Sequence, residues 1–174
     1  MLKNLLNLFK APQPAPDPTA DWPLLNPSTP AIDWSAGTVG GLRLGADLES
    51  ARGVFGKPDQ IKDGDKGCHS LVYQSAGFEI DSEDNRFVYA AIFTQPDPHL
   101  PAGITPASSL IDGFPFSQET TVEDFTRRFG EAETPHDVDD EEIIVTYQRH
   151  GLTLELEFTL ERTLKRLSLS LLKK

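Results

Sequence analysis

The chemical feature that stands out in this sequence is a run of carboxylates between Glu131 and Glu142. Three uses are open to such a run: a solvated connection that aids solubility, a calcium site, or a docking surface for a basic partner. The run lacks the Asp-x-Asp-x-Asp-Gly spacing of a calcium loop, which disfavours the metal. Clustered carboxylates steer association and fit the cationic groove of a toxin that acts on phosphates. The docking hypothesis therefore assigns partner binding to five acidic residues: Asp137, Asp139, Asp140, Glu141 and Glu142.

Two tyrosines form the second candidate for partner binding. Tyr73 and Tyr147 lie 74 residues apart, and each is followed by glutamine. Tyrosine rings on an exposed sheet face are anchors that dominate many protein interfaces. The alternative is a pair of core residues whose hydroxyl groups reach the rim of the core. The sequence leaves both alternatives open, and both tyrosines are included among the predicted partner-binding residues.

The familiar catalytic and metal-binding motifs do not occur in the sequence. There is no Gly-x-Ser-x-Gly nucleophile elbow, and Gly56-Lys57 is followed by Pro58 where a phosphate loop needs serine or threonine. Cys68 and His69 are adjacent, so on a strand their side chains point to opposite faces, which disfavours a thiolate–imidazolium pair. The four histidines lack the i, i+4 helical spacing of zinc hydrolases. We therefore expect no enzyme activity, no metal and no cofactor.

Charge and composition narrow the classes of partner. The chain has 174 residues, of which 38% are hydrophobic, a proportion typical of a globular protein that buries a core. With 27 acidic and 16 basic side chains the formal charge is −11, which repels phosphate backbones and disfavours nucleic acid as a partner. A single cysteine excludes an internal disulfide. No stretch reaches the ~20 apolar residues of a membrane-spanning helix.

The first 35 residues differ in composition from the rest. Residues 1–10 form a short amphipathic segment with an apolar helical face, and they lack the cleavage site of a signal peptide. We therefore expect a cytoplasmic protein, with weak membrane contact by residues 1–10 as one alternative beside packing and partner contact. Residues 11–35 form a Pro-rich tether. Trp22 and Trp34 bracket its far end, and either pin it onto the domain or face a ligand.

A duplicated pattern organises the remainder of the chain. Segments 48–55 and 122–129 each have an apolar stripe at helical spacing, and each ends at a Phe-Gly pair, 74 residues apart. Thr120 and Glu123 predict a capping box for the second helix. The same offset relates the two tyrosines and the turn glycines that follow them. We interpret this agreement as an internal duplication.

Predicted strands follow each predicted helix. Segments 151–159 and 163–171 alternate apolar and polar residues, which is typical of an antiparallel meander with one buried face. We predict an α+β fold of two tandem repeats, each a short strand, one helix and a three-stranded antiparallel meander, packed as a helix-on-sheet sandwich. The first repeat is expected over residues 36–100 and the second over 101–174, with residues 36–174 forming one compact unit.

The first half of this pattern resembles a known superfamily. The stretch Gly41–Asp59 has a Leu-Gly start, a helix, and an apolar-Gly-x-Pro ending before a loop and a meander. It is similar to the opening motif of the superfamily that contains the small outer-membrane lipoprotein A family and the beta-lactamase inhibitory protein, which repeats the unit in tandem. The resemblance covers residues 41–94 well and 113–171 more loosely, with Ala132 in place of the proline. It implies binding of another protein through a sheet face and its loops.

Small acidic proteins of this kind are also similar to the immunity proteins that neutralise toxins of bacterial competition systems. We therefore expect a non-catalytic protein-binding module of the immunity type, which occludes the active site of a cognate toxin that has a basic groove. Two alternatives are an unrecognised carboxylate-based enzyme with its site between the halves, and an accessory protein of the cell envelope.

Overall fold

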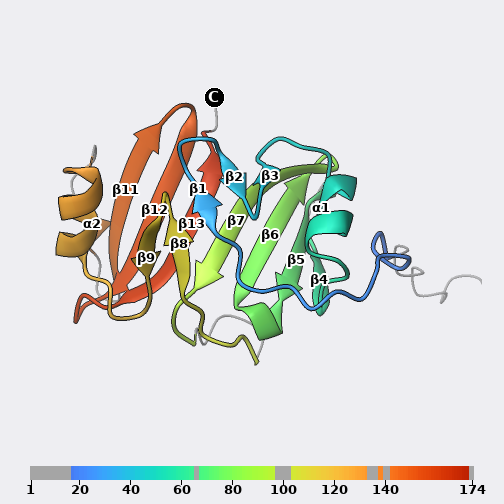
Figure 1. Cartoon of the computed structure of the whole chain (residues 1–174), viewed down its shortest axis with the longest axis horizontal. Helices are drawn as coiled ribbons and strands as arrows, with labels where there is room; N and C mark the ends of the chain where they lie inside the picture. Colours follow the sequence, from blue (N-terminus) through green and yellow to red (C-terminus); the bar gives the residue numbers. More distant parts are fainter. Residues whose placement is uncertain (1–16, 65–66, 97–102, 133–136, 139–141, 173–174) are drawn as a thin grey trace, which may run out of the picture.

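The computed structural model describes residues 17–64, 67–96, 103–132, 137–138 and 142–172, which form two β-sheets and two short α-helices (Figure 1). The larger sheet has eight strands, in the lateral order β10 (Asp137–Val138), β11 (Glu142–Arg149), β12 (Leu152–Thr159), β13 (Leu164–Leu171), β7 (Arg86–Phe93), β6 (Phe78–Glu83), β5 (His69–Tyr73) and β4 (Gln60–Asp63). The smaller sheet has five, in the order β3 (Leu42–Arg43), β2 (Thr38–Val39), β1 (Ile32–Asp33), β8 (Ser109–Ile111) and β9 (Phe114–Phe116).

Alternating side chains explain the long strands of the larger sheet. The two segments predicted to alternate form β12 and β13, and their leucines are buried except Leu171, while most of the residues between them are partly exposed. A tight turn joins β11 to β12 at His150-Gly151, where φ is 54° and 77°. Two consecutive residues of positive φ match the twist of a two-residue hairpin, so this turn sets the register of the pair.

The pair formed by β13 and β7 joins the two halves of the larger sheet. The strands are antiparallel, with Leu167 opposite Ile92 and Leu169 opposite Ala90. All four of these side chains are buried. Since β12 continues the ladder on one side and β6 on the other, strands from both halves of the chain share one continuous face.

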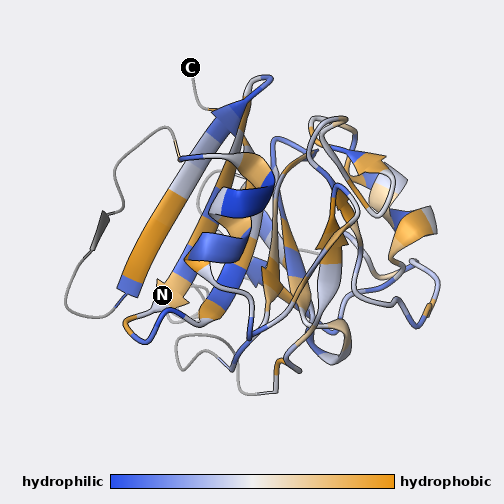
Figure 2. Cartoon of the chain, turned by 60° about the vertical axis from the view of Figure 1, so that its left-hand side comes forward, coloured by the Kyte–Doolittle hydropathy of each residue, from blue (hydrophilic) through white to orange (hydrophobic). Residues whose placement is uncertain are grey.

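One face of the larger sheet, called here the inner face, is covered by the smaller sheet and by helices α1 (Glu49–Val54) and α2 (Val122–Phe129), which lie toward its two ends (Figure 1). At one end the Phe55 ring, directly after α1, lies 5.3 Å from the Phe78 ring between centroids. At the other end Phe125 of α2 lies 6.2 Å from Phe158. The solvent side of α2 is hydrophilic (Figure 2). The main core therefore lies between the larger sheet and this covering layer.

The mixed helix and sheet content confirms the predicted α+β class. The smaller sheet was not predicted because its strands have two or three residues, too few to show a period of two. Each half of the larger sheet has four strands where three were predicted, the additional ones being β4 and β10. The helix and sheet content does not test the tandem repeats or the helix-on-sheet sandwich, so both remain predictions.

From residue 17 onward, the segment predicted to be a tether packs against both halves of the chain, and the Trp34 ring lies 5.7 Å from that of Phe129. Trp22 is 4% exposed and Trp34 is 2% exposed, so both rings belong to the core and neither faces a ligand. The Thr29 hydroxyl donates to the Ala76 carbonyl at 2.7 Å. The predicted tether extends to residue 35, whereas β1 begins before that point and pairs with β8 in parallel.

Helix α2 begins with a capping box one residue later than predicted. The Thr121 hydroxyl accepts from the Asp124 amide at 3.3 Å, and the Asp124 carboxylate accepts from the Thr121 amide at 3.1 Å. The predicted cap, Thr120, is buried and its hydroxyl accepts from the Ser117 amide at 2.9 Å. The hydroxyl of Thr120 is therefore already used in the preceding turn, which leaves Thr121 as the cap.

The two tyrosines predicted as partner-binding anchors lie on the inner face. Tyr73 and Tyr147 are each 1% exposed. The Tyr73 hydroxyl donates to the Gly56 carbonyl at 2.9 Å, and the Tyr147 hydroxyl donates to the Gly130 carbonyl at 3.2 Å. The prediction of exposed anchors is therefore wrong, because both rings are packed in the core and both hydroxyl groups bind the glycine that ends a helix. The core alternative holds.

Replacement of these hydroxyl groups tests their structural role. We expect Tyr73→Phe to lower the free energy of unfolding by about 1 kcal/mol, because it removes a buried hydrogen bond and leaves a carbonyl without it. Tyr147→Phe is expected to cost less, since its bond is longer and less buried. Urea unfolding monitored by fluorescence measures both. Unchanged stability in the two variants would contradict this assignment.

Candidate binding groove on the open sheet face

The second face of the larger sheet, called here the outer face, carries mostly polar side chains in rows that cross the strands. In one row Asp81 is opposite Tyr89, Tyr89 is opposite Ser170, and Ser170 is opposite Thr153. The next row runs from Glu79 through Ala91 and Ser168 to Glu155. At the junction of β7 and β13 three side chains are small, namely Ala91, Ser168 and Ser170, and the fourth is the larger Tyr89.

Part of the outer face is covered by the chain itself. Ile104 packs against Val72, Ala91 and Phe93 to form a second, smaller apolar cluster. The Ala107 amide donates to the Phe93 carbonyl at 2.8 Å and holds this segment on the sheet. Beyond this cluster, the described outer face has both buried positions, such as Glu157 and Ser168, and partly exposed ones, such as Tyr89 and Ser170.

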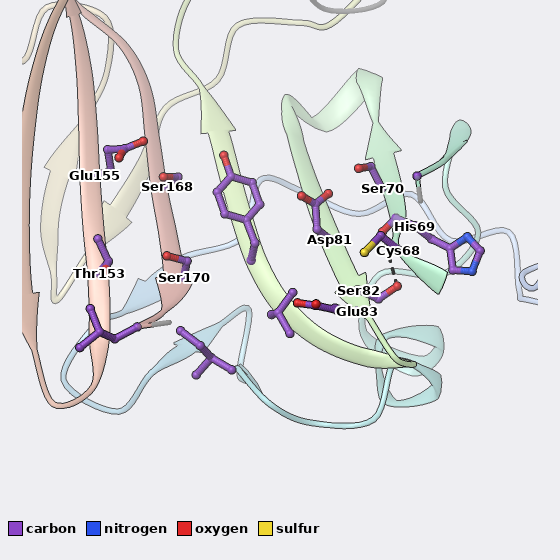
Figure 3. Close-up of a pocket in the computed structure, with 15 residues that line it drawn as sticks. Cys68, His69, Ser70, Asp81, Ser82, Glu83, Thr153, Glu155, Ser168 and Ser170 are labelled. Carbon is purple, nitrogen blue, oxygen red and sulfur yellow. Dashed lines mark hydrogen bonds between the residues drawn. The ribbon is translucent and has the colours of Figure 1, made fainter. Parts of the chain in front are cut away.

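The open part of the outer face contains a groove of about 660 Å³ between the two halves of the larger sheet. Figure 3 shows Asp81 and Ser70 on one side of it, and Glu155, Ser168 and Ser170 on the other. The groove is hollow because serines stand in the row positions between longer side chains. A volume of this size suits a small ligand or a protruding side chain of a partner.

The described lining of the groove is acidic. It includes the carboxylates of Asp81, Glu83 and Glu155, and it includes no lysine or arginine. Glu155 is partly exposed and Glu83 is exposed. A groove with walls of one charge focuses the field and attracts ligands of opposite charge.

Asp81 is the residue of the groove lining whose carboxyl group lies in an unfavourable environment. Its Oδ1 atom is covered and has no hydrogen-bond partner among the described residues. Burial raises the pKa of the Asp81 carboxyl, while a hydrogen bond from Ser70 and the charges of Lys62 and Arg166 oppose the rise. An ionised carboxylate in this position is therefore held at a cost to stability.

Arg166 lies one row from the groove and is already paired. It forms a salt bridge with Glu157, which is 6% exposed. Burial raises the pKa of Glu157, and the Arg166 charge opposes the rise. Burial also raises the pKa of the Tyr89 phenol, again opposed by Arg166. Arg166, two residues before Ser168, is therefore paired with a carboxylate that does not line the groove.

The groove does not present a thiol–imidazole pair. Figure 3 shows the sulfur of Cys68 and the ring of His69 pointing in different directions, as expected for neighbours in the chain. No group of three or more histidine, cysteine, aspartate and glutamate side chains is placed to hold a metal within the residues that the structure describes.

The structure describes only part of the acidic run, and none of the described part lines the groove. Asp137 belongs to β10, and Glu142 begins β11, where its carboxylate accepts from the Lys165 ammonium at 2.6 Å. Asp139, Asp140 and Glu141 lie outside the described residues. The structure therefore separates the predicted set: the tyrosines are in the core, and Glu142 is held by an internal ion pair.

The groove residues themselves were not predicted from the sequence. The alternation of β13 places Ser168 and Ser170 on a polar face, but it does not indicate which strand lies beside them. Tyr89 is not part of the 74-residue offset that relates Tyr73 to Tyr147. Only the β13–β7 pairing brings Tyr89 and Ser170 together.

Comparison with known proteins shows similarity of fold at low identity. No protein-family model and no curated protein matches the chain. A solved DUF4309 family protein from Bacillus subtilis is 16% identical with a TM-score of 0.51, over 76% of this chain and 84% of that one. Identity at this level shows a shared fold alone.

Two further solved structures match more weakly. An extracellular protein containing an SCP domain from Bacillus anthracis is 14% identical, with a TM-score of 0.49 over 73% of this chain. A cysteine-rich secretory protein from Staphylococcus aureus is 12% identical, with a TM-score of 0.40 over 83% of this chain. The matches span 43% and 48% of those two chains.

Within the described residues, neither helix has the length and apolar character needed to cross a membrane.

The cost of the Asp81 carboxylate gives a pH-dependent prediction. Because its pKa is raised in the folded state, the group reduces stability as pH rises from the unfolded value of about 3.9 through the folded value. Asp81→Asn is therefore expected to increase the free energy of unfolding at pH 7, and the gain should disappear as pH falls below about 3.9. Chemical denaturation across this pH range measures it, with the exposed Glu161→Gln as control. Loss of stability in Asp81→Asn at pH 7 would contradict the assignment.

Proposed function

We propose that this chain is a non-catalytic protein-binding module that binds its partner with the outer face of the larger sheet. The observation that carries the proposal is the open acidic groove at the junction of β7 and β13. Most of the groove is built on hydrogen-bonded strands, with a register shift between Asp81 and Ser82, so much of its wall is held in place before a partner arrives. Most of the polar groups that line the groove are hydroxyls and carboxylates. Such groups can bind a partner, and here they do not form a familiar catalytic arrangement.

The more specific form of the proposal is an immunity-type inhibitor that occludes the active site of a bacterial toxin. The formal charge of −11 and the acidic groove favour a partner with a basic surface. A toxin that acts on phosphates needs such a surface at its active site. The carboxylate run from Glu131 to Glu142 adds a second acidic element for steering the encounter. Such an inhibitor acts in the cytoplasm, and cell fractionation tests this placement.

We also propose that the two halves of the chain are tandem repeats, as in the superfamily that contains the beta-lactamase inhibitory protein. Three matched features support this. Each half donates a tyrosine hydroxyl to the carbonyl of the glycine that ends a helix, 17 residues earlier in both cases. Each has a phenylalanine at that helix end, next to the tyrosine ring. Each has a hairpin turn with a glycine of positive φ, at Gly41 and at Gly113.

A carboxylate-based enzyme is the second candidate, because the groove lies between the halves and holds a carboxyl group of raised pKa. The spacing of the carboxylates argues against it. Asp81 and Glu155 lie on β6 and β12, three strand spacings apart, which is about 14 Å. Paired carboxylates in glycoside hydrolysis are about 5 to 9.5 Å apart. The groove is therefore better suited to binding than to acid–base catalysis.

Capture experiments with groove-blocking variants test the proposal. Immobilised chain is incubated with native lysate of its source organism, and bound proteins are identified by mass spectrometry. We expect one protein at stoichiometric amounts with wild type, and about tenfold less with Ser170→Trp, which fills the groove. Glu155→Lys, which reverses one charge at its wall, should weaken capture too.

Leu110→Trp provides the matched control, because Leu110 is 44% exposed on β8 of the smaller sheet, on the opposite side of the molecule. Its capture is expected to equal that of wild type. Circular dichroism checks that each variant is folded. Capture lost equally in both tryptophan variants, or no stoichiometric partner for wild type, would contradict the proposal.

A further inference from the structure

An unsatisfied carboxylate oxygen is the feature of the groove that fold stability does not explain. Oδ1 of Asp81 has no hydrogen-bond partner among the described residues, although burial of an unpaired charged acceptor is costly. The two oxygens of an aspartate exchange by rotation about a soft terminal torsion. A donor that enters the groove can therefore engage this carboxylate without a change in the backbone.

An aromatic ring lies directly beside that carboxylate. Tyr89 is opposite Asp81 on the neighbouring strand, and both line the groove. Cross-strand neighbours on one face have Cβ atoms about 5 Å apart. A carboxylate next to an aromatic ring suits a planar cation, which donates to the carboxylate while its face packs on the ring.

Two arginines of the chain already make these two kinds of contact, one with an aromatic ring and one with a carboxylate. The Arg149 guanidinium lies 4.8 Å from the centroid of the Trp34 ring. Arg166 pairs with the buried Glu157, beside the same Tyr89. Arg166 is thus paired with Glu157, whereas the described lining of the groove contains Asp81 and Glu155 and no lysine or arginine.

We infer that the groove receives an arginine side chain of the protein partner, with Asp81 as the acceptor and Tyr89 as the aromatic wall. This inference rests on the proposed function and specifies its contact. Glu155 on the far wall adds negative charge, and Ser70 and Ser170 supply hydroxyl acceptors for the remaining guanidinium protons. Arginine fits better than lysine, because its planar fork matches a carboxylate and stacks on a ring.

The full chain is titrated with a blocked Gly-Arg-Gly peptide at millimolar concentration, and binding is followed by NMR. We expect shifts of the Tyr89 and Ser170 amide resonances. A peptide with citrulline in place of arginine has nearly the same shape without the charge, and should bind about tenfold more weakly or less. Equal binding of the two peptides, or no shift with the arginine peptide, would overturn the inference. Tighter binding of free spermidine than of the arginine peptide would overturn it as well, since the site would then serve a small polyamine.

Two variants separate a functional carboxylate from a structural one. Asp81→Asn should weaken the arginine peptide about tenfold or more while it raises stability at pH 7. Glu161→Gln removes the same charge from an exposed turn outside the groove, and should bind like wild type. Unchanged affinity in Asp81→Asn would overturn the inference.

Partner capture distinguishes the inference from the proposed function. Capture that is lost in Ser170→Trp and also falls in Asp81→Asn supports both. Capture lost in Ser170→Trp and kept in Asp81→Asn contradicts the arginine contact alone, because the outer face still binds. Capture unaffected by Ser170→Trp contradicts the proposed function itself.

Discussion

The antiparallel pairing of β13 with β7 is the contact on which the rest of the molecule depends. It joins two four-stranded halves into one sheet and gives both halves a shared inner face and a shared outer face. On the inner face Leu167 and Leu169 meet Ile92 and Ala90 in the core. On the outer face the same register places serines of β13 beside Tyr89 of β7. One ladder therefore creates both the continuous core and the groove.

The two faces differ in the groups that they bury. On the inner face the tyrosine hydroxyls have acceptors and the aromatic rings pack against one another, although Nε1 of Trp22 and of Trp34 has no hydrogen-bond partner among the described residues. The outer face holds carboxylates whose pKa is raised by burial, including Asp81 with an oxygen that has no partner. Groups that reduce stability persist where they serve recognition, since natural proteins need only enough stability to fold. The location of this cost, in the groove, is the physical basis for assigning binding to the outer face.

The sequence predicted well what local pattern determines and poorly what depends on lateral strand order. The period of two in β12 and β13 and the glycine that ends α2 are properties of neighbouring residues, and both predictions agree with the structure. The capping box was misplaced by one residue because two adjacent threonines compete for the role. For Tyr73 and Tyr147 the sequence left a core and an exposed position open, because it does not show which face of a strand is covered. The groove was not predicted, because Asp81 and Ser170 are far apart in sequence and reach the same groove only through two strand pairings that no local pattern encodes.

Hydroxyl-radical footprinting of the free chain and of its complex with the captured partner reports which face of the larger sheet the partner covers. Tyr89 and Cys68 line the groove and are partly exposed, and both are readily oxidised, whereas Leu24 and Leu110 are exposed away from it. The outer-face account predicts that the partner protects Tyr89 and Cys68 and leaves the oxidation of both leucines unchanged. Protection of Leu110 with continued oxidation of Tyr89 would place the partner on the opposite side of the molecule and contradict the account.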